Sequence, residues 1–492
     1  MRSTTAISPA PPGSSRELFR VALPLIVSAG SLSLMQFCDR LFLTWYSDDA
    51  LAAALPASLL NWTVMSVVIG TAMYVNTFVA QYEGAGRRDR VAASMWQGIY
   101  LSLAAGLGLL FVVPFSAEIF ALVGHDPAVQ RLESDYFSIV CAGAMPITLS
   151  AVMSCFYSGR GKSLVVMWVN FAAVGVNAVL DAVLIFGPGP FPRLGMKGAA
   201  IATVAANVVS VIVYATLLLR EREYPLWRER RFDPALFARI VRHGLPNGLQ
   251  FLMDIASFSL FVFLVGRLGK VELAATNLTF NLNLLAFLPM LGLGTAVMTL
   301  VGTRIGEGRP QLAVRTTWIA FLWSGSYMAL FVSAYLFLPE AIMHPFTLGA
   351  TEGDFPAIAA QTKVLLRFLA AFSFFDAMAV VFGSAIRGAG DTRFSLAYTT
   401  FTCWVLMALP TAIATIWFGG SLIVSWWACT TYIVALGAGF MLRFHRGRWQ
   451  SMRVIEAEPD LVAAELGPVS PDSQDSPPPG EHPVEPRAGC AR

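Results

Sequence analysis

Four aspartates lie inside long apolar stretches of this chain, where an ionised carboxylate is costly: Asp39, Asp181, Asp254 and Asp376. Placing one acidic residue at the centre of a lipid-spanning helix costs about 2.5–3.5 kcal/mol. Such a carboxylate is stable when it is protonated, bound to sodium or paired with another cation. The chemistry that these residues could perform is therefore reversible binding of H+, Na+ or a cationic ligand.

Polar side chains accompany the aspartates at helical spacing. Gln36 and Ser28 lie on the side of Asp39, and Ser373 lies one turn from Asp376. Three further stripes are Asn170, Asn177 and Asp181; Thr203, Asn207 and Ser210; and Asn247, Gln250, Asp254 and Ser257. Lipid offers no hydrogen-bond partner, so these stripes must face the interior of a bundle or a wet cavity. The alternative interpretation is that these polar side chains only hold neighbouring helices together. This purely structural role explains a single Asn or Thr better than it explains four aspartates.

Aromatic residues gather near the second pair of aspartates and would suit flat, apolar cations through cation–π contact. With the polar stripe, they indicate a second ion or substrate site at Asp254, Asp376 and Gln250. The residues that we expect in a substrate cavity are Asn247, Phe251, Asn277, Asn281 and Phe287.

The composition shows which elements must position these residues. Of 492 residues, 56% are apolar and only 13% are charged, whereas a soluble domain has about 25% charged residues. A helix needs about 20 apolar residues to cross the hydrocarbon core, and runs of that length recur. They predict an all-α integral membrane protein of about twelve transmembrane helices, over residues 17–45, 51–81, 91–116, 132–158, 164–187, 198–220, 241–267, 273–304, 311–338, 358–387, 394–418 and 421–443.

An internal repeat organises these helices. At an offset of 222 residues, Pro24 aligns with Pro246 and Gly84 with Gly306. Because six spans is an even number, the two copies enter the membrane in the same orientation. They should be related by a pseudo-twofold axis along the membrane normal, as parallel repeats are. We therefore expect an N-terminal six-helix lobe over 17–220, a cytoplasmic linker over 221–240, a C-terminal six-helix lobe over 241–443, and disordered cytoplasmic tails over 1–16 and 447–492.

Most of the Arg and Lys residues lie in the loops and tails of one side. This positive-inside bias predicts that both termini are cytoplasmic. Each basic cluster is short and adjoins a span, which excludes a nucleic-acid surface. The strong excess of Arg over Lys favours a GC-rich genome and hence a bacterial plasma (inner) membrane.

Motifs for covalent chemistry are missing from the sequence. No P-loop, HExxH or GxSxG occurs in a suitable context, and the six cysteines form no metal-binding CxxC spacing. A membrane transferase would need a metal-binding DxxD or a histidine cluster, and neither is found. We expect no enzymatic activity and no cofactor.

Several short motifs, in their order and spacing over about residues 17–443, resemble the multidrug and toxic compound extrusion (MATE) family, in particular its bacterial NorM and DinF branches. They include Cys-Asp39-Arg, Asn177-Ala-Val-Leu-Asp181 and Ile-Arg387-Gly-Ala-Gly-Asp-Thr-Arg393. The resemblance implies a secondary antiporter that exchanges cationic or amphipathic drugs for H+ or Na+ by alternating access, and we expect it to act as a monomer.

The resemblance also implies site residues. Asp39, Asn177, Asp181 and Thr203 match the first-lobe cation or proton site of the DinF and archaeal branches. Asp254 and Asp376 match the second-lobe carboxylates of the NorM branch, where the first is usually Glu. Na+ could be held by either aspartate pair. The alternative function is a flippase or exporter of lipid-linked or polysaccharide precursors, which would favour a cavity lined by cations rather than carboxylates.

Overall fold

The computed structural model describes residues 11–121, 125–187, 192–347, 355–417 and 419–456, and these residues form helices and short connections. In chain order the helices are α1 (Ser15–Tyr46), α2 (Asp48–Met73), α3 (Val75–Gly84), α4 (Arg88–Leu110), α5 (Ser116–Ala121), α6 (Pro127–Ala142), α7 (Ala144–Ser158), α8 (Ser163–Phe186), α9 (Met196–Arg220), α10 (Pro234–Gly266), α11 (Lys270–Gly306), α12 (Pro310–Phe337), α13 (Pro339–Thr347), α14 (Phe355–Ala389), α15 (Thr392–Phe401), α16 (Leu409–Trp417) and α17 (Leu422–His445).

Long apolar helices dominate the described part of the chain. Eleven of them, some built from consecutive segments, are long and apolar enough to cross a membrane. The number becomes 12 if α6 and α7, which meet at a bend of 49°, count as one span. The prediction of an all-α fold with about twelve spans is confirmed, and the protein is a multi-pass membrane protein.

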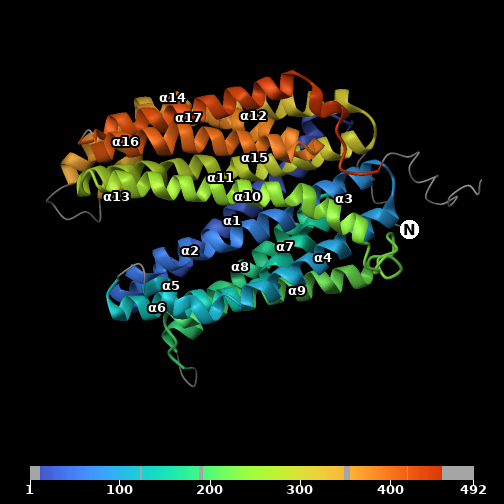
Figure 1. The fold of residues 1–492 in the computed structure, drawn as a ribbon, viewed down its shortest axis with the longest axis horizontal. Helices are drawn as coiled ribbons and strands as arrows, with labels where there is room; N and C mark the ends of the chain where they lie inside the picture. The colour runs from blue at the N-terminus through green and yellow to red at the C-terminus, as the bar shows by residue number, and fades with distance from the viewer. Residues whose placement is uncertain (1–10, 122–124, 188–191, 348–354, 418, 457–492) are drawn as a thin grey trace, which may run out of the picture. The chain divides into compact units, whose positions relative to one another are not determined.

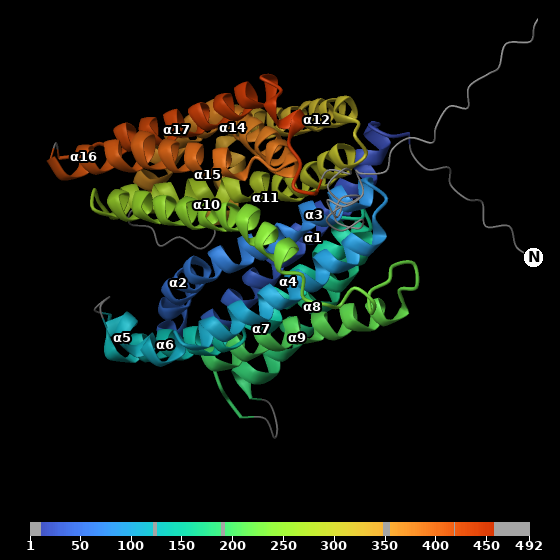
Figure 2. The ribbon, with the colours of Figure 1, turned by 45° about the vertical axis from the view of Figure 1, so that its right-hand side comes forward.

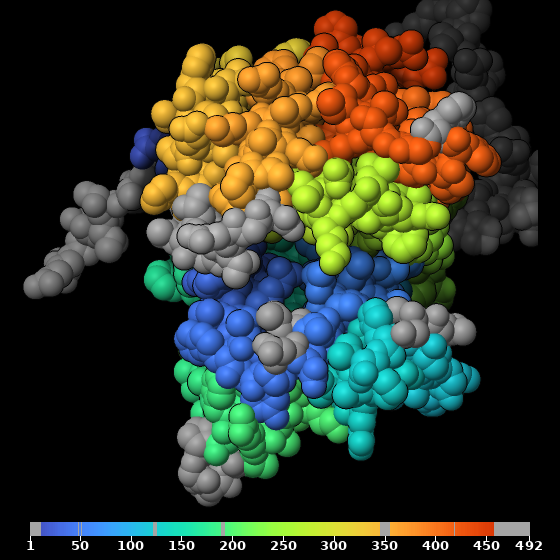
Figure 3. Space-filling view, turned by 90° about the vertical axis from the view of Figure 1, so that its left-hand side faces the viewer, coloured from blue at the N-terminus to red at the C-terminus, as the bar shows by residue number. Residues whose placement is uncertain are grey.

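Within residues 1–454 the helices form two lobes, α1–α9 and α10–α17 (Figures 1 and 2). They lie against each other at the end where α1 begins and α17 finishes, which we call the terminal end. They separate toward the opposite, distal end, where α2 begins and α16 finishes. Viewed from the distal end, the surface is recessed between the lobes (Figure 3). The lobes meet where α1 and α3 pack on α11 and where α2 packs on α10, and we call this contact the interlobe seam.

Glycines bring the two backbones into close contact at the seam. A Cβ added to Gly84 would lie 2.0 Å from the carbonyl oxygen of Thr303, and one added to Gly306 would lie 2.0 Å from that of Gln81. The 222-residue offset maps each of these contacts onto the other. The seam therefore follows the pseudo-twofold relation expected from the sequence repeat.

A second glycine pair repeats the pattern deeper in the bundle. A Cβ on Gly70 would lie 2.7 Å from the Cα of Gly248, and one on Gly292 would lie 2.5 Å from the Cα of Ile26. These positions also correspond at an offset of 222. Small residues thus let backbones approach closely without side chains between them, as is common in packed membrane helices.

The linker and the start of α10 differ from the prediction. α10 begins at Pro234, and Asp233 caps it by accepting a hydrogen bond from the Leu236 amide at 3.0 Å. The predicted linker of 221–240 is therefore wrong at its end. The Asp-Pro pair is a helix start signal that lies outside the apolar run, so hydropathy alone does not find it.

The chain after α17 also differs from the prediction. Residues 447–456, predicted to belong to a disordered tail, include a short helix, Arg448–Ser451, and a fully buried Trp449. The Val454 amide donates to Oε1 of Gln81 at 3.0 Å. Residues 447–454 form a strap across the terminal end. Of the predicted N-terminal tail of 1–16, residues 11–16 are described and α1 already begins at Ser15, whereas residues 1–10 and 457–492 lie outside the described residues.

Gln81 joins this strap to the seam. It is fully buried on α3, and its Nε2 donates to the carbonyls of Gly388 at 3.0 Å and Ala389 at 3.3 Å. A second contact between the lobes at this end is the ion pair of Arg304 with Glu17.

We predict that Gln81→Leu lowers the free energy of unfolding by about 2–4 kcal/mol. The variant loses three hydrogen bonds, each of which contributes about 0.5–1.5 kcal/mol net. Denaturant unfolding in detergent micelles measures this loss. Ser326→Ala is the control, because the Ser326 hydroxyl is exposed and bonds only within its own helix. Equal stability of the two variants would contradict the role given to Gln81.

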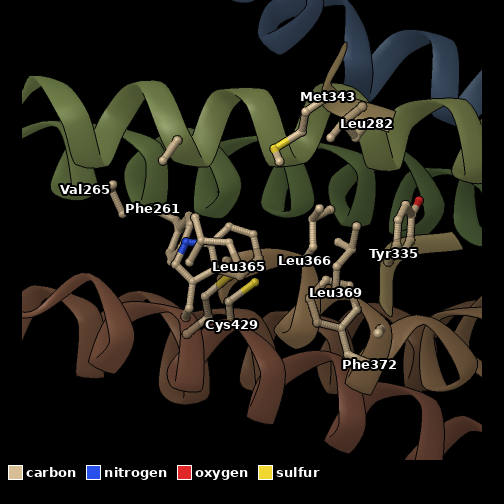
Figure 4. Close-up of a cluster of buried hydrophobic side chains, with 14 residues drawn as sticks. Phe261, Val265, Leu282, Tyr335, Met343, Leu365, Leu366, Leu369, Phe372 and Cys429 are labelled. Carbon is tan, nitrogen blue, oxygen red and sulfur yellow. The ribbon is translucent and has the colours of Figure 1, made fainter. Parts of the chain in front are cut away.

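Apolar side chains fill the C-terminal lobe at membrane depth. Phe261, Leu365, Leu369, Phe372 and Cys429 belong to one buried cluster contributed by α10, α14 and α17 (Figure 4). This cluster fixes the relative position of the helices that carry Asp254 and Asp376.

Candidate functional site

The N-terminal lobe brings two of the predicted aspartates together. Asp39 on α1 and Asp181 on α8 hydrogen-bond to each other through their carboxyl groups. In the amide orientation that satisfies both, the Asn177 side-chain nitrogen donates to Oδ1 of Asp39 at 3.0 Å and to Oδ2 of Asp181 at 3.2 Å. Asn177 and Asp181 are fully buried. We call these three residues the N-lobe acid cluster.

Helical spacing explains how this cluster forms. Asn170, Asn177 and Asp181 lie on one face of α8, and α8 packs on α1. At the other end of the contact, Asn170 donates to the Ser28 hydroxyl at 2.5 Å. The two polar stripes predicted on these helices therefore face each other.

Among the described contacts, none joins the Thr203 side chain to the N-lobe acid cluster. Its hydroxyl donates to the Ala199 carbonyl of its own helix, α9, at 3.1 Å. A role for Thr203 in ion binding stays a prediction.

Tyr136, which the sequence analysis did not single out, adjoins the cluster. Its ring on α6 lies within electrostatic range of both Asp39 and Asp181, and its hydroxyl bonds to Ser58. A single tyrosine near the end of a span resembles the aromatic residues common at membrane interfaces. The sequence alone therefore offered little signal for it.

The chemistry open to the acid cluster follows from its charges. Two carboxyl groups in contact share a proton or are bridged by a metal cation, because two bare anions would repel each other. Oδ1 of Asp181 is buried and has no hydrogen-bond partner among the described residues. Binding of an exchangeable small cation by the cluster stays a prediction.

The C-terminal lobe does not pair its two aspartates in the same way. Asp254 on α10 is hydrogen-bonded to Gln250, one turn before it, and Arg387 on α14 acts on it electrostatically. Arg387, on the last turn of α14, is partly buried, and its Nη2 donates to the Ser384 hydroxyl at 3.2 Å. Asp254 therefore has a built-in positive neighbour.

Asp376 lies beside aromatic and thiol groups instead. Tyr335 and Cys429 are within its electrostatic range, and Tyr432 on α17 is within range of both Asp376 and Asp254. The two aspartates predicted as one pair therefore share Tyr432 as an electrostatic neighbour, but no described contact joins them to each other.

The five predicted cavity residues fall into two groups. Asn247 is used at the seam, where it donates to the Gly70 carbonyl at 2.8 Å. Asn277 and Asn281 lie one turn apart and are exposed in the distal half of α11, and Phe251 is also exposed, whereas Phe287 is half-buried. Exposed amides at this depth favour water rather than lipid beside them, and a place for Asn277 and Asn281 in a substrate cavity stays a prediction.

Comparison with known proteins agrees with this architecture. The family model MatE matches residues 24–183 and 246–413, one match in each lobe. A probable multidrug resistance protein NorM of Xanthomonas campestris pv. campestris is 30% identical over 400 residues, which cover 78% of this chain and 84% of that protein. A probable multidrug resistance protein NorM of Thermotoga maritima is 25% identical and covers 90% and 95% of the two chains.

Solved structures share the fold. An outward-facing multidrug resistance MATE family transporter of the MOP superfamily superposes with a TM-score of 0.80 at 21% identity, over 89% of this chain and 96% of that one. A MOP superfamily transporter from Pyrococcus furiosus gives 0.79 at 21% identity, over 89% and 97%. With both lobes matched by the family model, this chain belongs to the MatE family of membrane transporters.

Proposed function

We propose that the protein is a secondary efflux transporter that exchanges cationic or amphipathic drugs for H+ or Na+ by alternating access. The observation that carries this proposal is the N-lobe acid cluster, which holds two carboxylates and a bridging amide at membrane depth. The names of the NorM relatives support multidrug compounds as the substrate class. The distribution of Arg and Lys supports a bacterial inner membrane with both termini in the cytoplasm.

Competition between cations couples the uptake of the ion to the export of the drug. A buried carboxylate exchanges one positive partner for another, so uptake of an ion favours release of a cationic drug. The lobes contact each other at the terminal end and are separate at the distal end, which supports an outward-open state. Rocking of the lobes about the seam would then open the terminal end.

Asp376 is the better candidate for drug contact in the C-terminal lobe. Asp254 has the Arg387 guanidinium within electrostatic range, whereas Asp376 has Tyr335, Tyr432 and Cys429 within range. Aromatic rings beside a carboxylate suit a flat cation. Asp376, rather than Asp254, would then pair with the drug.

Vesicle transport tests the proposal. Purified protein in liposomes preloaded with ethidium should release it after a pH jump or a sodium jump, and the effective jump identifies the coupling ion. Asp376→Asn is expected to raise the KM for ethidium about tenfold, which corresponds to about 1.4 kcal/mol. Asp254→Asn is expected to raise this KM by a smaller factor. Absence of release with either gradient would exclude ion-driven exchange, and an unchanged KM in Asp376→Asn would exclude its contact with the drug.

A further inference from the structure

The distal end of the N-terminal lobe holds a buried acid that the mechanism above does not use. Glu133 on α6 is fully buried. Its Oε1 lies 2.8 Å from Nδ1 of His125, and the His125 side chain is 38% exposed. Its Oε2 is buried and has no hydrogen-bond partner among the described residues. A carboxylate removed from water with one oxygen unsatisfied is costly, so a purely structural role explains it poorly.

Glu133 is placed between the distal surface and the acid cluster. It precedes Tyr136 by three residues on α6, and residues at this spacing are neighbours on one helix face. Tyr136 in turn lies within electrostatic range of Asp39 and Asp181. His125, Glu133 and Tyr136 therefore lie in this order at and along the start of α6, and Tyr136 packs against the buried apolar cluster that includes Phe120 and Phe137.

Other charged groups near α6 are engaged or lie at the surface. Lys197 on α9 pairs with Asp135 at 3.0 Å, and Asp126 caps α6 by accepting from the Ala128 amide. Glu118 on α5, Asp49 on α2, Arg131 on α6 and Arg40 on α1 are exposed, and Arg40 also acts electrostatically on Asp39 and Tyr136. Among the described ion pairs, Glu133 has His125 as its cationic partner.

We propose that His125 and Glu133 form the proton uptake relay that serves the N-lobe acid cluster from the distal side. This inference rests on the proposed function and specifies H+ as the ion that the cluster exchanges. Imidazole changes its charge in the physiological pH range, so the exposed ring can collect a proton from the medium. The imidazolium then gives its Nδ1 proton to Oε1 of Glu133 and becomes neutral.

The second step returns the relay to its starting state. The Glu133 carboxyl releases the proton toward the Tyr136 hydroxyl and the Asp39–Asp181 pair, and the carboxylate is restored beside His125. Glu133 is thus a positioning residue for the proton, whereas the acid cluster remains the exchange site.

The experiment measures ethidium transport in proteoliposomes at a fixed pH gradient while the pH on the distal side is varied. Glu133→Gln keeps the shape of the side chain but cannot carry a proton. It should lower the rate about tenfold at high distal pH and approach the wild-type rate at low distal pH, where the cluster is protonated directly. Ethidium affinity should stay unchanged. Asp135→Asn, two residues away and paired at the surface, is the matched control and should follow the wild type at every pH.

Three other results would overturn the relay. A Glu133→Gln profile that follows the wild type at every distal pH excludes it. An equal loss at every pH, with lower thermal stability, assigns Glu133 a structural role. Release driven by sodium but not by a pH jump in the wild type excludes the relay while leaving antiport intact, whereas no release by either ion removes the proposed function itself.

Discussion

Asp39→Asn is expected to reduce ion-driven efflux by more than tenfold, the largest effect of any single substitution in this protein. Asn cannot release or accept a proton and has no charge to hold sodium, so the cluster with Asp181 and Asn177 loses its exchangeable cation. Asp181→Asn should have the same effect. Because the two carboxyls act as one unit, the double variant should be no worse than either single one. Ethidium efflux from liposomes under the effective gradient measures all three.

Stability separates this loss from misfolding. Asn at position 39 is uncharged and can still hydrogen-bond to Asp181, so thermal unfolding in detergent should occur close to the wild-type temperature. Asp49→Asn, which changes an exposed acid at the distal end of α2, is the control and should transport normally. Efflux by Asp39→Asn at half the wild-type rate or more would show that the cluster is not the exchange site.

Gly306→Val is expected to stop turnover by a different route. Its side chain would begin 2.0 Å from the Gln81 carbonyl oxygen, so the lobes could not close at the terminal end. The transporter should remain open there, with efflux reduced at least tenfold. A Thr303→Cys reporter in a background without other cysteines should be labelled faster by a thiol reagent added on the terminal side.

The repeat supplies an internal check on this result. Gly84→Val should act in the same way, because its contact with Thr303 is the pseudo-twofold equivalent. Gly108→Val, on an exposed face of α4 where a Cβ meets no atom within 4 Å, is the control. Normal efflux with Gly306→Val would mean that terminal closure is not part of the cycle.

Hydropathy and the repeat predicted most of the fold. The span expected at 17–45 is α1, Ser15–Tyr46, and the offset that relates Gly84 to Gly306 is also the symmetry of the seam. Hydropathy and the repeat did not predict helix starts that lie outside the apolar runs, such as the start of α10. Trp449 was missed because one buried aromatic in a polar stretch gives no periodic signal.

The site was predictable only in part. Asn177 and Asp181 share a helix face, which spacing reveals, but their contact with Asp39 depends on how α1 packs on α8. The influence of Arg387 on Asp254 was not predicted, although a side chain on the last turn of a helix points back toward that helix's N-terminus and can reach an interior acid. Tyr136 and Glu133 lie near a span end, where polar and aromatic residues are common and need no special explanation.

The strap has a consequence for how the chain assembles during synthesis. Gln81 leaves the ribosome 373 residues before its partner Val454, which follows α17. The hydrogen bond between the strap and the seam can therefore form only after α1–α17 have been synthesised. A nascent chain stopped before Trp449 would contain α1–α17 but would lack the contacts of the strap at the terminal end.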